Sequence, residues 1–247
     1  MRAFWWFEEN SIAGMARPGF NSAHWFEMSF AEGVLMGWLG QFPSGTASLT
    51  AFQHHVQTYA HKIVKFYNLK QEETNRIIGN LQEKMGILNT AKSLTMHTEA
   101  LDHLTIENEQ IHFQFSEKRL HTEMDFLKDL GFKRIATLTE QHHNKEILQK
   151  HFELHHFPIV DLEAPKLEQA LQLADLIKAS QKSQEKLAVH CLAGIGRTST
   201  MIMAAHMAMG ENLNSLKEKI ARQNPSFVLT GSQETFLHSV AEKFNTV

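Results

Sequence analysis

Residues 189–198 read Val189-His190-Cys191-Leu192-Ala193-Gly194-Ile195-Gly196-Arg197-Thr198, and this stretch decides the fold around it. The apolar run at residues 187–189 predicts a short buried strand, and the apolar run at residues 198–209 predicts a buried helix. The only cysteine of the chain therefore lies in a strand-to-helix turn. Five residues separate Cys191 from Arg197, which is enough for a loop whose backbone N–H groups point inward at a helix N-terminus. Such a loop can hold one phosphate-sized dianion.

The residue types in this loop suit nucleophilic attack on phosphorus. A thiol attacks as its thiolate, and a free cysteine is mostly protonated at neutral pH. Inward-pointing N–H groups, the helix N-terminus and the Arg197 guanidinium all favour a negative charge on Cys191. Arg197 also offers a planar fork for two phosphoryl oxygens. Thr198 comes next, and we expect its hydroxyl to stabilise the Cys191 thiolate as the leaving group of a second step.

The order of the predicted elements indicates an α/β fold with a central, mostly parallel sheet flanked by helices. Strands are expected at residues 4–7, 11–19, 133–139, 152–159 and 187–189, and helices at 123–130, 144–150, from 165 onward, at 198–209, 213–223 and 233–244. The first two strands are expected to form an edge hairpin. Arg17 lies at its end and is a candidate for the rim of the phosphate site.

A leaving alkoxide or phenolate needs a proton, and a carboxylic acid on a neighbouring loop is the expected donor. Residues 160–165 form a loop between the strand predicted at 152–159 and the next helix. Because sites in parallel sheets lie at the carboxyl ends of the strands, we expect this loop to meet Cys191. Asp161 is the candidate acid, and Glu163 is the fallback.

The block between Pro18 and Glu123 has helical and polar patterns and no obvious site. Amphipathic helices are predicted at residues 50–67 and 70–85, whereas residues 111–115 alternate like a strand but are not assigned. No Pro-rich or Gly-rich linker marks a hinge. We therefore expect a single domain over residues 1–247, with a helical insertion at 20–120 packed on it. The insertion is a cap over the cleft, a docking platform or an elaboration of the core, and a helical cap is favoured.

Composition excludes several classes of protein. The 247 residues carry 24 basic and 27 acidic side chains, so there is no general electrostatic case for nucleic acid or an anionic membrane. The most apolar stretch, residues 34–42, is shorter than the roughly 18 residues that span a bilayer, and we expect no stable membrane insertion. A single cysteine excludes an internal disulfide and a reductase that recycles through paired cysteines, and it suits the reducing cytoplasm.

Sixteen histidines include adjacent pairs at residues 54–55, 142–143 and 155–156. Adjacent side chains point to different sides of a helix or strand, so we expect no metal site and no cofactor. His190, next to the cysteine, is interpreted as a strand-end residue that holds the loop by hydrogen bonds rather than as a proton carrier.

His190-Cys191, five residues and then Arg197-Thr198 resemble the signature of the cysteine-dependent protein tyrosine phosphatase superfamily. The likeness is greatest to small atypical dual-specificity phosphatases, which share an aromatic N-terminal strand followed by Ala-Gly and a proline, here residues 4–18. Residues 159–161 resemble the acid loop of that branch, and residues 224–226 with Gln233 resemble its glutamine-bearing segment. The resemblance covers about residues 1–18 and 120–247, and departs from the branch in the long block between them.

The resemblance implies a role for each matching residue. Cys191 would be the nucleophile, Arg197 the phosphate clamp, Asp161 the general acid and then base, and Thr198 the helper of the thiolate. Gln233 would orient the hydrolytic water. The phosphate-binding loop would consist of Leu192, Ala193, Gly194, Ile195, Gly196 and Arg197.

Three functions are compatible with these residues. The first is a metal-independent protein phosphatase that acts on phosphotyrosine, and also on phosphoserine or phosphothreonine, through a phosphocysteine intermediate. The second keeps the chemistry but acts on a phosphoinositide or an RNA 5′-phosphate, and the neutral side chains of Leu192, Ala193 and Ile195 count against it. The third is a non-catalytic module that binds phosphoproteins, which commonly lacks the nucleophile, the clamp or the acid. We expect a phosphorylated protein as the partner and no nucleic acid, and the oligomeric state is not predicted.

Overall fold

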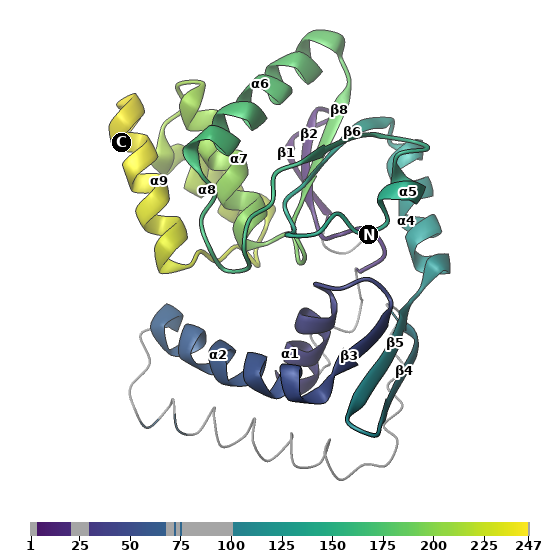
Figure 1. Ribbon diagram of the computed structural model, residues 1–247. Coiled ribbons are helices and arrows are strands. Elements are labelled where there is room, and N and C mark those ends of the chain that lie inside the picture. The colour runs from purple at the N-terminus through teal and green to yellow at the C-terminus, as the bar shows by residue number, and fades with distance from the viewer. Residues whose placement is uncertain (1–3, 21–29, 68–71, 73–74, 76–100, 247) are drawn as a thin grey trace. The chain divides into compact units, whose positions relative to one another are not determined.

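The computed structural model describes residues 4–20, 30–67, 72, 75 and 101–246 of the chain (Figure 1). The chain divides into two compact units, one made of Met1–Asn21 with His121–Val247 and the other of Ser22–Leu120. Apart from residues 72 and 75, the helix expected at 70–85 lies outside the described residues. No helix in the described part of the chain is long and apolar enough to cross a membrane.

The first unit contains a five-stranded sheet in the order β1-β2-β8-β6-β7. The strands are β1 Phe4–Glu8, β2 Ile12–Met15, β6 Phe132–Thr137, β7 Glu153–His156 and β8 Lys186–His190. β1 pairs with β2 in the antiparallel sense, and the other three pairings are parallel. This arrangement confirms the predicted mostly parallel sheet with an edge hairpin. β8 lies at its centre, so the chain emerges into the cysteine loop between β2 and β6.

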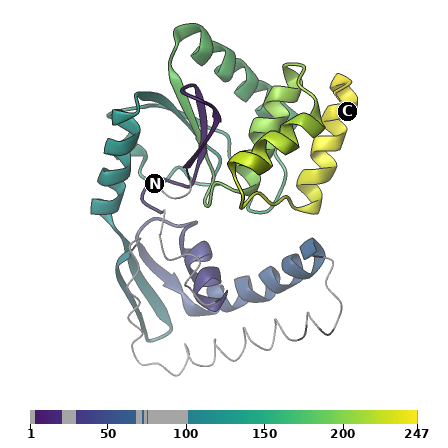
Figure 2. The ribbon, with the colours of Figure 1, turned by 180° about the vertical axis from the view of Figure 1, so that it is seen from behind.

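Helices cover both faces of this sheet (Figures 1 and 2). On one face lie α6 Leu167–Ser183, α7 Gly196–Ala208, α8 Leu213–Gln223 and α9 Gly231–Phe244, and on the other lie α4 Glu117–Asp129 and α5 Lys145–Leu148. α7 packs against α6, α8 and α9, and its residues from Arg197 to Met207 are all buried. On the opposite face, the Phe4 ring contacts Phe126 of α4 and Phe132 of β6.

Several helices begin at other residues than the sequence predicts, and two of these differences concern the cysteine loop and the loop before α6. α7 starts at Gly196 rather than Thr198, so Arg197 and Thr198 lie in its first turn. α6 starts at Leu167 with Lys166 as the N-cap, because the Gln169 side chain accepts a hydrogen bond of 2.8 Å from the Lys166 N–H. Pro165 therefore precedes the helix instead of lying in its first turn.

The second unit contains α1 Phe30–Leu39, α2 Leu49–Tyr67 and a three-stranded antiparallel sheet in the order β3-β5-β4. Its strands are β3 Gly45–Ser48, β4 Leu101–Glu107 and β5 Gln110–Phe115. The block expected to be helical is thus a mixture of helices and strands. The hairpin escapes prediction because its turn is Asn108-Glu109, two non-glycine residues with φ of 50° and 61°, whereas the usual signal is an Asn-Gly pair. Its role as a cap or docking region stays a prediction.

Candidate active site

The cysteine loop is held by its fit against the end of β2. Gly194 has φ +73°, and a Cβ at this position would lie 2.5 Å from the carbonyl carbon of Met15. The Gly194 carbonyl accepts hydrogen bonds from Trp5 Nε1 at 3.2 Å and from Asn224 Nδ2 at 3.3 Å. Its N–H donates to Cys191 Sγ at 3.3 Å. The loop therefore aims a backbone donor at the sulfur, as the sequence predicts, and Cys191 itself is 3% exposed.

His190 anchors the start of this loop through two hydrogen bonds. Its Nδ1 lies 3.0 Å from the Cys191 carbonyl oxygen, and its Nε2 lies 2.9 Å from Thr137 Oγ1. A carbonyl only accepts, so Nδ1 carries the proton and the Thr137 hydroxyl donates to Nε2. Burial lowers the pKa of His190 from 6.5 to about 3, since a charged imidazolium would lose its hydration. These contacts suit a neutral residue that holds the loop rather than one that carries protons.

Arg17 lies beside the loop and bonds to it through its backbone N–H. Its N–H donates to the Leu192 carbonyl at 3.0 Å, while its guanidinium lies 4.8 Å from the centre of the Phe20 ring. The side chain is buried, and desolvation lowers the pKa of Arg17 to about 9. Arg17 therefore lies against the phosphate loop, bonded to Leu192 through its backbone, with its side chain buried.

Arg197 and the candidate acid, Asp161, lie in direct contact. Arg197 Nη2 forms an ion pair of 2.8 Å with Asp161 Oδ1, and its Nη1 donates to the Ile159 carbonyl at 2.9 Å. The guanidinium is 5% exposed and the Asp161 side chain 28%. Glu163 is exposed, and of the two candidate acids Asp161 is the one that contacts Arg197. The ion pair itself was not predicted.

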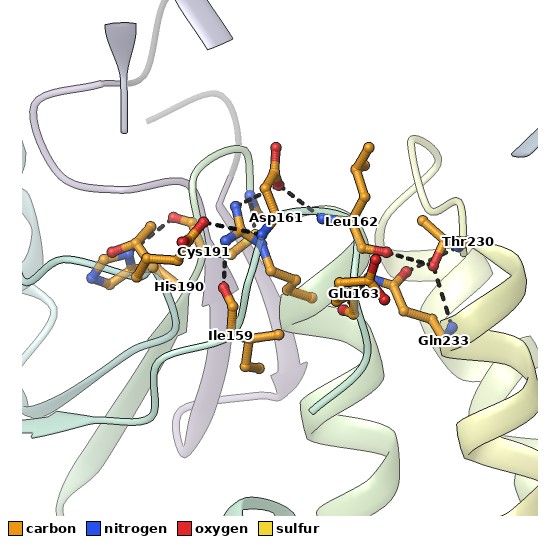
Figure 3. A network of polar contacts seen from close by, with 12 residues as sticks. Ile159, Asp161, Leu162, Glu163, His190, Cys191, Thr230 and Gln233 are labelled. Carbon is orange, nitrogen blue, oxygen red and sulfur yellow. Dashed lines mark hydrogen bonds and ion pairs between the residues drawn. The ribbon is translucent and has the colours of Figure 1, made fainter. Parts of the chain in front are cut away.

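Asp161, the candidate acid, lies in a tight turn that hydrogen bonds hold from two sides. The Glu163 N–H donates to the Val160 carbonyl at 3.0 Å, and Leu162 between them has φ +65°. The Asp161 N–H donates to Glu140 Oε1 at 3.3 Å, and Asp161 Oδ1 accepts from the Leu162 N–H at 3.1 Å. On the other side, Thr230 and Gln233 of the α9 cap donate to this turn (Figure 3).

Gln233 and Thr198 are both buried, and they differ in whether their side chains have hydrogen-bond partners. A Cβ at Gly196 would lie 3.1 Å from Gln233 Oε1. The Gln233 amide accepts from the Thr230 N–H at 3.0 Å and donates to the Glu163 carbonyl at 3.1 Å. Thr198 Oγ1 has no hydrogen-bond partner within the described part of the chain. The role of the Thr198 hydroxyl toward Cys191 stays a prediction, whereas the Gln233 amide is bonded to Thr230 and Glu163.

Sequence reasoning missed Thr230 and Glu140, which fasten the acid loop. Thr230 and Gln233 have the Thr-x-x-Gln spacing of a helix capping box, and this spacing could have marked the start of α9. Nothing in the sequence ties Glu140 to Asp161, which lies 21 residues further along the chain.

A separate group of metal-type donors lies outside this site. Oxygen and nitrogen atoms of Glu8, His206 and Glu211 lie within 4.8 Å of one another. His206 Nδ1 and Glu211 Oε1 are 2.5 Å apart, which is a hydrogen-bond distance, and burial lowers the pKa of His206. The predicted catalytic residues contribute nothing to this group.

Residues 113–211 match the family model described as "Polymorphic toxin system, DSP-PTPase phosphatase". This part of the chain is similar to phosphatase domains of the dual-specificity type, which supports a cysteine-dependent phosphatase. The matched part of this phosphatase domain contains Asp161, Cys191, Arg197 and Thr198, and it ends before Gln233. The resemblance read from the cysteine loop is thereby confirmed.

Solved structures of phosphatases are similar to part of the chain. Tk-PTP in its active form is 28% identical, with 49% of this chain and 86% of that chain covered and a TM-score of 0.45. PTPMT1 in complex with PI(5)P is 18% identical, with 51% and 86% covered and a TM-score of 0.46. Human DUSP28 is 14% identical, with 49% and 85% covered and a TM-score of 0.45.

Proposed function

We propose that the domain hydrolyses phosphotyrosine in proteins, and also phosphoserine and phosphothreonine, through a phosphocysteine intermediate on Cys191. The observation that carries this proposal is the contact between Arg197 and Asp161 at the mouth of the cysteine loop, 2.8 Å between Nη2 and Oδ1. Because the two side chains lie this close, a phosphoryl group bound by Arg197 would be within reach of the Asp161 carboxyl.

In the first step, Arg197 and the loop N–H groups bind the phosphoryl oxygens and Cys191 Sγ attacks phosphorus. An S–P bond forms, the P–O bond to the substrate breaks, and Asp161 gives its proton to the leaving oxygen. In the second step, Asp161 takes a proton from water, whose oxygen attacks phosphorus. The S–P bond breaks, inorganic phosphate leaves, and Thr198 stabilises the returning thiolate.

Neutral side chains around the loop support a substrate with a single phosphate. Leu192, Ala193 and Ile195 carry no charge, whereas a headgroup with several phosphates would favour lysine there. Two large apolar side chains on the flanking loops are exposed, those of Val160 and Val228. Val160 lies next to Asp161 in the chain, and the Val228 carbonyl would lie 3.4 Å from a Cβ placed on Gly196. An apolar rim suits an aromatic ring better than a sugar or an inositol.

A substrate panel tests the proposal. Wild-type protein is assayed with phosphotyrosine, phosphoserine and phosphothreonine peptides, with phosphoinositides and with 5′-phosphorylated RNA, and Cys191→Ser serves as the inactive control. The family model names a polymorphic toxin system, so phosphoproteins of a target cell belong in the panel. We expect the highest kcat/KM on phosphotyrosine. Preference for a phosphoinositide or RNA would overturn the substrate, and binding without turnover would indicate a non-catalytic module.

A further inference from the structure

The acid loop has a strained backbone that its own residues do not explain. Leu162 has φ +65°, a left-handed conformation that costs a non-glycine residue free energy. Strain of this kind persists only where surrounding contacts impose it. The loop therefore needs partners outside residues 160–163, and the start of α9 provides them.

Thr230 and Gln233 form the capping box of α9, and each also bonds to the acid loop. Thr230 Oγ1 accepts from the Gln233 N–H at 3.2 Å and donates to the Leu162 carbonyl at 2.8 Å. Gln233 Oε1 accepts from the Thr230 N–H at 3.0 Å, and its Nε2 donates to the Glu163 carbonyl at 3.1 Å. Two successive carbonyls that follow the acid are thus fixed by one helix cap (Figure 3).

We propose that the α9 capping box positions the general acid, with Thr230 as a positioning residue that acts through Leu162 on Asp161. The proposal rests on the proposed function, in which Asp161 is the acid. Hydroxyl donation to Leu162 holds the left-handed turn, and that turn places the Asp161 carboxyl 2.8 Å from Arg197. Gln233 serves the same purpose at Glu163, so its described contacts position the acid rather than a water molecule.

Thr230 is 9% exposed as a residue, and its hydroxyl contacts the Leu162 carbonyl, the Gln233 N–H and, at 3.0 Å, Ser232 Oγ. Thr230→Val removes the hydroxyl and keeps the shape, whereas Thr230→Ser keeps both hydrogen bonds. Asn212→Ala is the matched control, because Asn212 caps a different helix, α8, through the N–H groups of Asn214 and Ser215. It removes a helix cap and leaves the cap of α9 in place.

The readout is kcat/KM for phenyl phosphate and for para-nitrophenyl phosphate, since it reports the steps up to cleavage of the P–O bond. Phenolate is the more basic leaving group and depends more on the acid. We compare kcat/KM for phenyl phosphate, divided by kcat/KM for para-nitrophenyl phosphate. Thr230→Val should lower this ratio by about three- to tenfold, as loss of one hydrogen bond would. Thr230→Ser should restore the wild-type ratio, and Asn212→Ala should keep it.

A double-mutant cycle separates this proposal from the assignment of the acid. In the Asp161→Asn background, Thr230→Val should lower the ratio no further, because its effect passes through Asp161. If Asp161→Asn lowers the ratio and Thr230→Val leaves it unchanged, the positioning role is wrong and the acid stands. If Asp161→Asn itself leaves the ratio unchanged, the proposed function is at fault. An equal effect of Asn212→Ala would reduce Thr230 to a helix cap.

Discussion

Replacement of Gly194 by alanine probes how the phosphate-binding loop is built. An added Cβ would lie 2.5 Å and 2.6 Å from the Met15 carbonyl carbon and oxygen and 2.7 Å from the Ala16 nitrogen. All three are backbone atoms, so no side chain can rotate away. The positive φ of +73° costs alanine about 1 kcal/mol, and overpacking adds about 1–3 kcal/mol. We therefore expect Gly194→Ala to lose about 2–4 kcal/mol of unfolding free energy.

Gly210→Ala is the matched control for this substitution. Gly210 also has a positive φ, +99°, but a Cβ there would meet nothing within 4 Å. Its cost is then the backbone contribution alone, about 1 kcal/mol.

Urea unfolding of wild type and both variants measures the difference, with the denaturant slope checked for equality. Because the Gly194 N–H donates to Cys191 Sγ at 3.3 Å, Gly194→Ala should also lower turnover of an aryl phosphate under conditions where it is folded. The account of the loop is refuted if Gly194→Ala is as stable as Gly210→Ala and turns over substrate like the wild type.

Two further substitutions test the charges of the site. Asp161→Asn removes the carboxylate that pairs with Arg197 at 2.8 Å, so that inorganic phosphate no longer competes with it for the guanidinium. A partly exposed ion pair contributes about 0.5–1 kcal/mol, so phosphate should inhibit the variant about two- to fivefold more strongly. An unchanged inhibition constant contradicts this. Burial lowers the pKa of His190 from 6.5 to about 3 in the folded protein. Between pH 6.5 and pH 3 the unfolded chain therefore binds more protons than the folded one, and the free energy of unfolding falls as the pH drops through this range. From pH 7.5 to 5.5 the loss from this residue is about 1 kcal/mol, and urea midpoints of His190→Gln should fall less than those of the wild type over the same range.

The elements around the catalytic loop could be predicted because their patterns are local. The buried run before Cys191, the apolar helix after it and the hairpin at the N-terminus each follow from a few adjacent residues, and the parallel order follows from their alternation. The hairpin of β4 and β5 was not predicted, because Asn108 and Glu109 adopt positive φ without the glycine that normally marks such a turn.

Contacts of the site were harder to predict than its residues. Asp161 and Cys191 were expected to meet because both follow strands, but the ion pair between Asp161 and Arg197 depends on side-chain positions that no spacing encodes. The same holds for Thr230, whose hydroxyl reaches Leu162 across 68 residues of sequence. Sequence spacing indicated the chemistry, and the packing of α9 against the acid loop was needed to see what holds the acid in place.

The most direct test of the central claim is detection of the phosphoryl group on Cys191 during turnover. Wild-type protein is mixed with an aryl phosphate, quenched in denaturant within one turnover and digested, and the peptide that contains Cys191 is analysed by mass spectrometry. The account predicts the mass of one added phosphoryl group on that peptide, and its loss together with turnover in Cys191→Ser. Turnover that continues in Cys191→Ser, or a wild-type Cys191 peptide that stays unmodified while substrate is hydrolysed, would contradict it.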